Sequence, residues 1–208
     1  MGVITRIEVQ KRDKRRANIF VDGSFVCGLS IETVVTMRLK TGGEVDADGL
    51  IEAIKEDEKR AAVATLLKML SAKRVTERQA REALQKREYM DESIECAVDK
   101  CRGYGYLDDA AYAADYVAAH KSKLGSLALK YELKQRGVSE DLINYAIEDI
   151  DEEEAACGLL KKYMRGGGLS DVKQKNKAVR YLASKGYKYD TVRRAIDCVA
   201  SETEDEES

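Results

Sequence analysis

The sequence has no proline and no tryptophan, and aromatic residues make up only 6% of its 208 residues. Without proline to interrupt helices, and with 36% charged residues, the composition favours a mainly helical fold. No apolar run approaches the roughly 18 residues of a membrane span. The start, Met1 to Arg6, lacks the apolar core of a signal peptide. We therefore expect a cytoplasmic protein that does not contact a membrane.

Residues that bind metals or act as nucleophiles are scarce as well. His120 is the only histidine, and no two cysteines have CxxC spacing. The five scattered cysteines are Cys27, Cys96, Cys101, Cys157 and Cys198. This pattern argues against a zinc site, a Cys-His nucleophile pair and a secreted disulfide framework. We expect no cofactor, no metal and no catalysis, and keep a small-molecule or metal-dependent enzyme only as a third hypothesis.

The N-terminal part has the period-two pattern of β-strands. Residues 3–10 alternate between apolar and polar side chains, and residues 17–21 resume the alternation. Asp22-Gly23 is typical of a two-residue hairpin turn before residues 24–27. These features predict a three-stranded meander, followed by a short helix over residues 31–39 that Ser30 caps.

From residue 58 onward the sequence repeats with a period of 49. Leu84, Leu133 and Leu182 lie 49 residues apart, and four further columns keep the same register. The columns are Glu88, Gly137 and Gly186; Ile94, Ile143 and Val192; Ala97, Ala146 and Ala195; and Val98, Ile147 and Ile196. Gly137 and Gly186 stand where the end of a helix favours a left-handed residue. A period of this length indicates an array of small helical bundles.

Each copy of the repeat predicts three helices. They cover residues 58–72, 76–87 and 91–102, then 108–122, 126–136 and 139–149, and finally 152–164, 171–185 and 189–200; another helix begins near residue 46. Thr76 and Gln79 form a capping box, and Gly166-Gly167-Gly168 predicts a flexible loop. The predicted fold is mainly α: a tandem array of three three-helix-bundle repeats, elongated and curved, with a small N-terminal β-meander and helix. The expected boundaries are 1–57, 58–106, 107–150 and 151–200, with a disordered acidic tail over 201–208.

A well-specified joint connects the first two copies. Asp108 is a good N-cap, and Asp109 places a negative charge in the first turn of the next helix. Leu107 and Tyr112 occupy the two positions of a hydrophobic staple, with Tyr106 before them and Tyr116 continuing the stripe. Adjacent helical residues do not face each other, so Asp108 and Asp109 are not a catalytic carboxylate pair. We assign this stretch an architectural role.

The net charge of −2 hides a strongly basic C-terminal region. Between Ala155 and Ile196 there are eleven Lys and Arg residues and only two acids, Asp171 and Asp190. Such density suits phosphate binding by counterion release, although a solvated helix face is the alternative. The candidate contact residues are Lys161, Lys162, Arg165, Lys173, Lys175, Lys177, Arg180, Lys185, Arg193 and Arg194, together with Lys130 and Arg136 from the second copy. No base-reading set accompanies them, which favours backbone or protein contact.

Three ordered motifs resemble the RecX family of bacterial recombination regulators. The first is Gly105-Tyr106-Leu107-Asp108-Asp109 with Tyr112-Ala113 and Tyr116-Val117. The second is Gly125, Glu132-Leu133 and Arg136-Gly137, and the third is Leu182, Lys185-Gly186-Tyr187 and Tyr189-Asp190. The similarity covers almost the entire chain.

The resemblance implies a non-enzymatic regulator. RecX proteins bind the RecA recombinase filament on single-stranded DNA and lower its ATPase, strand-exchange and coprotease activities, which would place this protein in homologous recombination, DNA repair and the SOS response. Basic patches would contact single- or double-stranded DNA, and we expect a monomer. The other hypothesis from the residues is a nucleic-acid-binding protein that acts through its basic third repeat without RecA.

Overall fold

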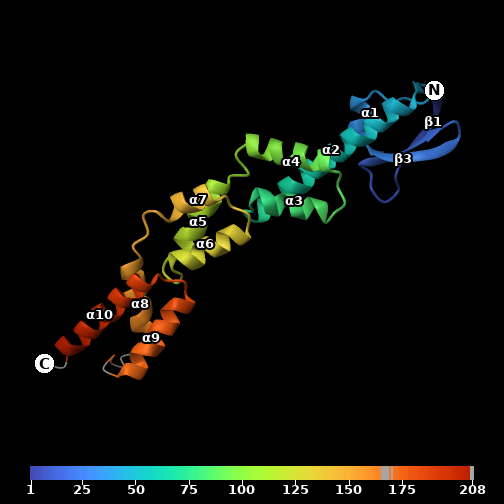
Figure 1. The fold of residues 1–208 in the computed structure, drawn as a ribbon. Helices are drawn as coiled ribbons and strands as arrows, with labels where there is room; N and C mark the ends of the chain where they lie inside the picture. The colour runs from blue at the N-terminus through green and yellow to red at the C-terminus, as the bar shows by residue number, and fades with distance from the viewer. Residues whose placement is uncertain (165–168, 170, 207–208) are drawn as a thin grey trace. The chain divides into compact units, whose positions relative to one another are not determined.

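The structure is a computed structural model that describes residues 1–164, 169 and 171–206. In this part of the chain there are ten helices and four strands, which fall into two compact units (Figure 1). Unit 1 comprises Met1–Arg74 and Ala80–Leu107, and unit 2 comprises Val75–Gln79 and Asp108–Ser208. The predicted Gly166-Gly167-Gly168 loop lies outside the described residues.

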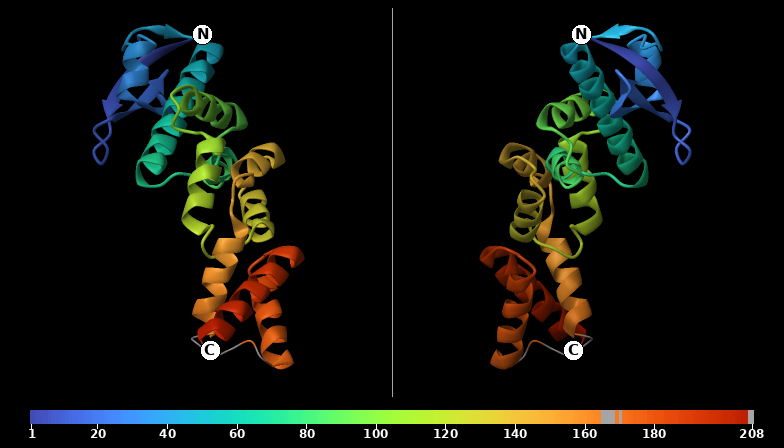
Figure 2. Two further views of the ribbon diagram at one scale, coloured as in Figure 1. Left: turned by 90° about the vertical axis from the view of Figure 1, so that its left-hand side faces the viewer. Right: turned by 90° about the vertical axis from the view of Figure 1, so that its right-hand side faces the viewer.

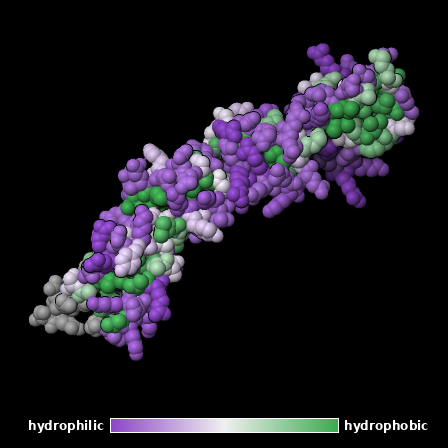
Figure 3. All heavy atoms as spheres, viewed as in Figure 1, coloured by the Kyte–Doolittle hydropathy of each residue, from purple (hydrophilic) through white to green (hydrophobic). Residues whose placement is uncertain are grey.

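Unit 1 begins with an antiparallel sheet in the order β3-β2-β1-β4. The strands are β1 (Gly2–Val9), β2 (Arg16–Val21), β3 (Ser24–Ser30) and β4 (Glu44–Val45). Asp22 and Gly23 both have positive φ, which confirms the predicted hairpin turn. The predicted three-stranded meander is confirmed as β1-β2-β3. The fourth strand, β4, was not predicted, because two residues are too short for an alternating pattern. Apolar spheres gather at the N-terminal sheet in Figure 3. Phe25 and Val26 of β3 are exposed.

Two helices follow the sheet, α1 (Ile31–Thr36) and α2 (Ala47–Ala72). Ser30 caps α1 as predicted, since its Oγ accepts a hydrogen bond from Thr33 N at 3.0 Å. The predicted division between a helix near residue 46 and another from Glu58 was wrong, because α2 runs through both without a break. Residues 55–59 include no glycine or proline that would end a helix. Unit 1 also contains α4 (Asp91–Gly103) and most of α3 (Glu77–Gln85).

Unit 2 contains two successive groups of three helices. The first group is α5 (Asp109–His120), α6 (Ser126–Gln135) and α7 (Glu140–Ile147). The second group is α8 (Glu152–Met164), α9 (Val172–Ser184) and α10 (Tyr189–Glu206), whose helices pack on one another (Figure 2). Each group has its own apolar core, around Leu133 in the first and Leu182 in the second. Helix α10 continues to Glu206, so the tail from Ser201 is helical where disorder was predicted, and residues 207–208 lie outside the described part.

The 49-residue repeat corresponds to one recurring helix end. Leu84, Leu133 and Leu182 are fully buried, and the residue four positions later has φ of 62°, 88° and 80° respectively. In each copy the next residue donates its backbone N–H to the leucine carbonyl, at 3.4, 3.1 and 3.3 Å. This is the Schellman arrangement, in which a left-handed residue satisfies the last carbonyls of a helix. The mainly helical fold of tandem three-helix groups is thereby confirmed.

Candidate protein and nucleic-acid interface

Asp108 and Asp109 each accept a backbone hydrogen bond at the N-terminus of a different helix. Asp108 caps its own helix, α5, by accepting a hydrogen bond from Ala111 N at 2.9 Å. Asp109 accepts from the backbone N–H of Glu77, the first residue of α3, also at 2.9 Å. The sequence indicated only a favourable charge for Asp109, because a contact over 32 residues leaves no local pattern. Asp108 is therefore the N-cap of α5, as predicted, and Asp109 joins α5 to the start of α3.

An equivalent contact links the two helical groups of unit 2. Glu152, the first residue of α8, accepts a hydrogen bond from Ser126 N at the start of α6 and another from Thr191 Oγ1 at 3.2 Å. Asp109 and Glu152 thus occupy the same position in successive groups. Each acid completes the N-terminus of a helix that comes earlier in the chain, where a negative charge is also favoured by the helix dipole.

The repeat glycines Gly137 and Gly186 allow further contacts between successive helical groups. Gly125 N donates to Lys185 O at 2.9 Å, and Leu127 N donates to Gly186 O at 3.1 Å. A Cβ atom on Gly186 would lie 2.4 Å from Ala128 Cβ, so the backbones approach too closely for a side chain. In the preceding copy, Thr76 Oγ1 donates to Arg136 O at 2.6 Å beside Gly137. Sequence reasoning found the left-handed conformation at these glycines but missed the close approach.

Helix α9 carries four cationic side chains and no acidic residue. Lys173, Lys175, Lys177 and Arg180 are all exposed, and Val172–Ser184 contains no acidic residue. Lys161 and Lys162 are exposed in the last turn of α8, which packs on α9. The structure therefore brings six of the predicted contact residues onto two adjacent helices, while Arg165 lies outside the described residues.

The remaining predicted contact residues are separate from this basic surface or already engaged within the protein. Arg193 and Arg194 are exposed on α10, where the Arg194 guanidinium lies 2.7 Å from the Glu153 carboxylate. Lys130 lies 3.0 Å from Glu140 and donates to Asn144 Oδ1 at 3.0 Å. Arg194 and Lys130 can reach a partner only by exchanging these contacts.

Arg136 belongs to a half-buried cluster with two residues of the family motifs. Its guanidinium carbon lies 4.7 Å from the centre of the Tyr116 ring, and Tyr116 OH donates a hydrogen bond to Glu132. Burial raises the pKa of Tyr116, and the hydrogen bond to Glu132 shifts this pKa in the same direction. The hydrogen bond with Tyr116 is the main cause that raises the pKa of Arg136. Arg136 therefore connects α5 and α6, in addition to its predicted role as a contact residue.

A stacked pair of tyrosines lies beside the basic surface. The rings of Tyr163 on α8 and Tyr181 on α9 have centroids 3.9 Å apart and planes inclined by 9°. Lys185 Nζ lies 5.8 Å from the centre of the Tyr181 ring. Sequence reasoning listed the surrounding cations but missed the tyrosines. The available signal was the placement of Tyr181 four residues from Lys177 and four from Lys185, on one helical face.

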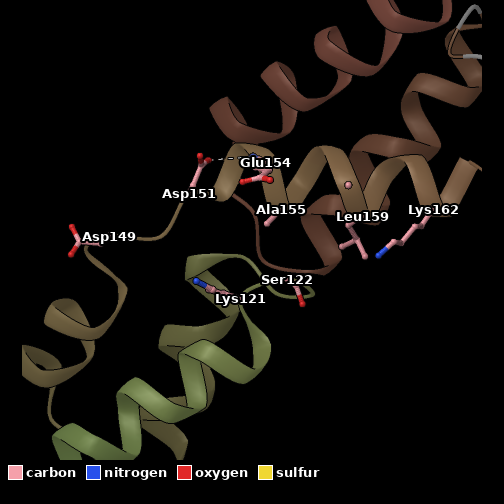
Figure 4. Close-up of a pocket in the computed structure, with 9 residues that line it drawn as sticks. Lys121, Ser122, Asp149, Asp151, Glu154, Ala155, Leu159 and Lys162 are labelled. Carbon is pink, nitrogen blue, oxygen red and sulfur yellow. Dashed lines mark hydrogen bonds between the residues drawn. The ribbon is translucent and has the colours of Figure 1, made fainter.

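A cleft of about 360 Å³ lies between the end of α5, the α7–α8 link and α8 (Figure 4). Its lining includes three carboxylates and two lysines, namely Asp149, Asp151, Glu154, Lys121 and Lys162. The Asp151 carboxylate accepts from Glu153 N at 3.0 Å and Glu154 N at 3.2 Å, so it caps α8. Among the described residues, no group of three or more acidic, histidine or cysteine side chains is placed to hold a metal. We assign no chemistry to this cleft.

The fold defines a class of protein that is built from successive three-helix groups. Most of the charged side chains described above lie on the outer surface of these packed helices. No helix in the described residues is long and apolar enough to cross a membrane. Residues 2–46 match the family model of the Regulatory protein RecX N-terminal domain. Residues 108–147 and 151–196 match the second and third three-helix domains of RecX.

Relatives across nearly the whole chain have the same name. The chain is 33% identical to "Regulatory protein RecX" of Clostridium botulinum (strain Alaska E43 / Type E3), covering 94% of this chain and 95% of the relative. The corresponding protein of Staphylococcus haemolyticus is 31% identical, covering 94% and 75%. A crystal structure of regulatory protein RecX superposes with a TM-score of 0.73 at 27% identity, covering 95% and 100%. The chain belongs to the RecX family of regulatory proteins.

Proposed function

We propose that this protein binds the RecA filament on single-stranded DNA and lowers its ATPase, strand-exchange and coprotease activities. The observation that carries the proposal is membership of the RecX regulatory family along 94% of the chain. We place the protein in the cytoplasm as a monomer that acts in homologous recombination, DNA repair and the SOS response. The predicted boundaries at residues 106/107 and 150/151 remain part of this proposal.

Successive three-helix groups suit a partner made of repeated subunits. Each group in unit 2 exposes tyrosines, including Tyr131 on α6, Tyr145 on α7 and Tyr189 on α10. Tyrosine is enriched among the residues that contribute most to protein interfaces. Linked contacts that engage together bind far more tightly than any one of them alone. Several modest contacts with neighbouring RecA subunits would therefore add up to a long-lived complex.

A titration of RecA-catalysed, DNA-dependent ATP hydrolysis tests this function. We expect the rate to fall at sub-stoichiometric amounts of the protein, because one bound molecule restrains more than one RecA subunit. The matched comparison is the Lys173→Ala, Lys175→Ala, Lys177→Ala triple variant. Inhibition that survives this change is carried by protein contact, whereas a rate unchanged by the unmodified protein across the titration would refute the proposal.

The second candidate function is nucleic-acid binding without RecA, and α9 favours it. Four exposed cations lie on a helix without a single acid. Cations at this density displace counterions from phosphates, so binding depends steeply on salt. For the triple lysine variant, the slope of log K against log salt on single-stranded DNA should decrease by about 2. A matched Lys11→Ala, Arg12→Ala, Lys14→Ala variant in the β1–β2 loop is the control and should keep the slope. If both variants bind single-stranded DNA equally well, α9 is only a solvated surface.

A further inference from the structure

We propose that the α8–α10 group contains a base-stacking subsite for single-stranded nucleic acid, formed by Tyr163 on Tyr181 and flanked by Lys177 and Lys185. The inference rests on the nucleic-acid binding proposed above and adds what that surface recognises. It assigns to Tyr163 the contact with an unpaired base and to the two lysines the neighbouring phosphates.

The two tyrosines form a platform with one open side. Their rings are nearly parallel, at 9°, with centroids 3.9 Å apart, so each ring covers one face of the other. Tyr181 is half-buried and packs against the apolar core around Leu182, which fixes its position. Tyr163 is 43% exposed although Tyr181 covers one of its faces. A planar base can therefore extend the stack on the outer side of Tyr163.

The charges around the platform match a nucleic-acid backbone. Lys177 and Lys185 each stand four residues from Tyr181, so the three side chains lie along one face of α9. Their Cα atoms are separated by about 12 Å, since each helical residue rises about 1.5 Å. In the part of the chain that the structure describes, neither lysine forms an ion pair with a carboxylate. Neither ammonium group is neutralised by a carboxylate, so both can pair with phosphates on either side of a stacked base, Lys185 by moving from its position over the Tyr181 ring.

An unpaired base fits this arrangement better than a duplex. In a duplex both faces of each base are covered by its neighbours, and exposing one face costs a few kcal/mol. Aromatic platforms within basic surfaces bind single strands without sequence preference, because every base has a π-face. The other tyrosine pair in unit 2, Tyr112 and Tyr116, lies beside the Glu132 carboxylate, which would repel a phosphate.

The absence of tryptophan from the chain gives a direct test. The Tyr163→Trp variant of the full chain carries a single indole at the platform, and a base stacked on the indole quenches its fluorescence. The probes are an oligothymidine, an abasic oligomer of the same length and a duplex. The matched control is Tyr145→Trp, because Tyr145 is exposed on α7, a helix that contains no lysine or arginine.

We expect oligothymidine to quench the Tyr163→Trp variant, while the abasic oligomer and the duplex leave its emission unchanged, as does every probe with Tyr145→Trp. Tyr163→Leu should bind oligothymidine about tenfold more weakly and bind the abasic oligomer as before. Tyr163→Phe keeps the ring and should keep the affinity, which separates stacking from a fault in folding.

Three results would overturn the inference. If oligothymidine binds without quenching, or if the abasic oligomer competes equally, the surface recognises phosphates alone and only the stacking subsite is wrong. If no probe binds, the proposed nucleic-acid function fails together with the subsite. Retained ATPase inhibition in that case would still support the RecA proposal.

Discussion

Asp57 shows how much of unit 1 depends on a single side chain. It is 6% exposed on α2, and its carboxylate accepts from Ser30 N at 2.7 Å and from Thr33 Oγ1 at 2.9 Å, beside Arg16 at 3.3 Å. Burial alone would raise the pKa of Asp57. The hydrogen bonds from Ser30 and Thr33, with the charge of Arg16, outweigh burial and hold this pKa below its ordinary value of 3.8.

Replacing this carboxylate should lower stability in a pH-dependent way. A depressed pKa in the folded state stabilises the protein above the unfolded value, and this contribution disappears as the pH falls through the folded pKa. We expect Asp57→Ala to lower the free energy of unfolding by about 3 kcal/mol at pH 7, because it leaves Ser30 N without its acceptor and Arg16 without its counter-charge. The difference from the unmodified protein should narrow below pH 4. Urea unfolding at pH 7 and pH 3 measures both effects.

The exposed Asp99 is the control for this measurement. Its ion pair with Arg102 lies on the surface of α4, where such pairs contribute less than about 1 kcal/mol. Asp99→Ala should therefore leave the urea midpoint nearly unchanged at either pH. A loss of equal size in the two variants would contradict the role given to Asp57.

At the scale of elements, the repeated helix end explains why the equivalent positions 88, 137 and 186 differ in the side chains that they tolerate. Gly137 and Gly186 adopt positive φ without strain, whereas Glu88 adopts φ of 62° with a side chain. Left-handed backbone costs a residue with a side chain roughly 1–2 kcal/mol. The first copy of the repeat therefore has a strained turn that the other two copies avoid.

Opposite substitutions at equivalent positions should change stability in opposite directions. Glu88→Gly should raise the free energy of unfolding by about 1 kcal/mol, because it relieves the backbone strain. Gly186→Ala should lower it by more than this amount, since the new methyl group also meets Ala128 at 2.4 Å. Thermal unfolding of both variants checks the signs. Destabilisation by Glu88→Gly would contradict the interpretation of the repeat.

Local patterns predicted the elements better than they predicted the contacts between them. The Thr76–Gln79 capping box forms in both directions, at 3.2 and 3.3 Å, because its whole signal lies within four residues. Strand β4 could not be predicted, since a two-residue strand depends on pairing with its neighbour. The continuity of α2 could not be predicted either, since a helix does not have to end where the elements that it packs against change. The contacts of Asp109 and Glu152 span 32 and 26 residues and leave no periodic trace.

At the scale of the whole molecule, charge is divided between a basic surface and an acidic end. Helix α10 packs on α8 and α9, and its sequence becomes acidic from Glu202 to Glu206. The family could be predicted from the order of the motifs, but the Tyr163–Tyr181 stack could not, because these residues lie 18 positions apart on different helices. A contact of that kind has no signature in one sequence.

Removing the acidic end should strengthen nucleic-acid binding if it competes for the basic surface. We expect deletion of Ser201–Ser208 to tighten binding of single-stranded DNA several-fold at low salt, with the difference lost at high salt because the competition is electrostatic. Fluorescence anisotropy at two salt concentrations measures this effect. Replacing the acidic residues by glutamine and asparagine at constant length is the control, and unchanged affinity would exclude competition.

The contacts between consecutive helical groups limit which segments of such a chain can be duplicated or deleted. Helix α6 begins with N–H groups whose acceptors come from Glu152 and from the turn at Gly186. Trimming away the last three helices would therefore strip acceptors from the group that remains. A segment that is duplicated or deleted has to include both the acid and the glycine that supply these acceptors. The acid and the glycine, rather than the bundle of three helices, are therefore the residues that have to be inherited together.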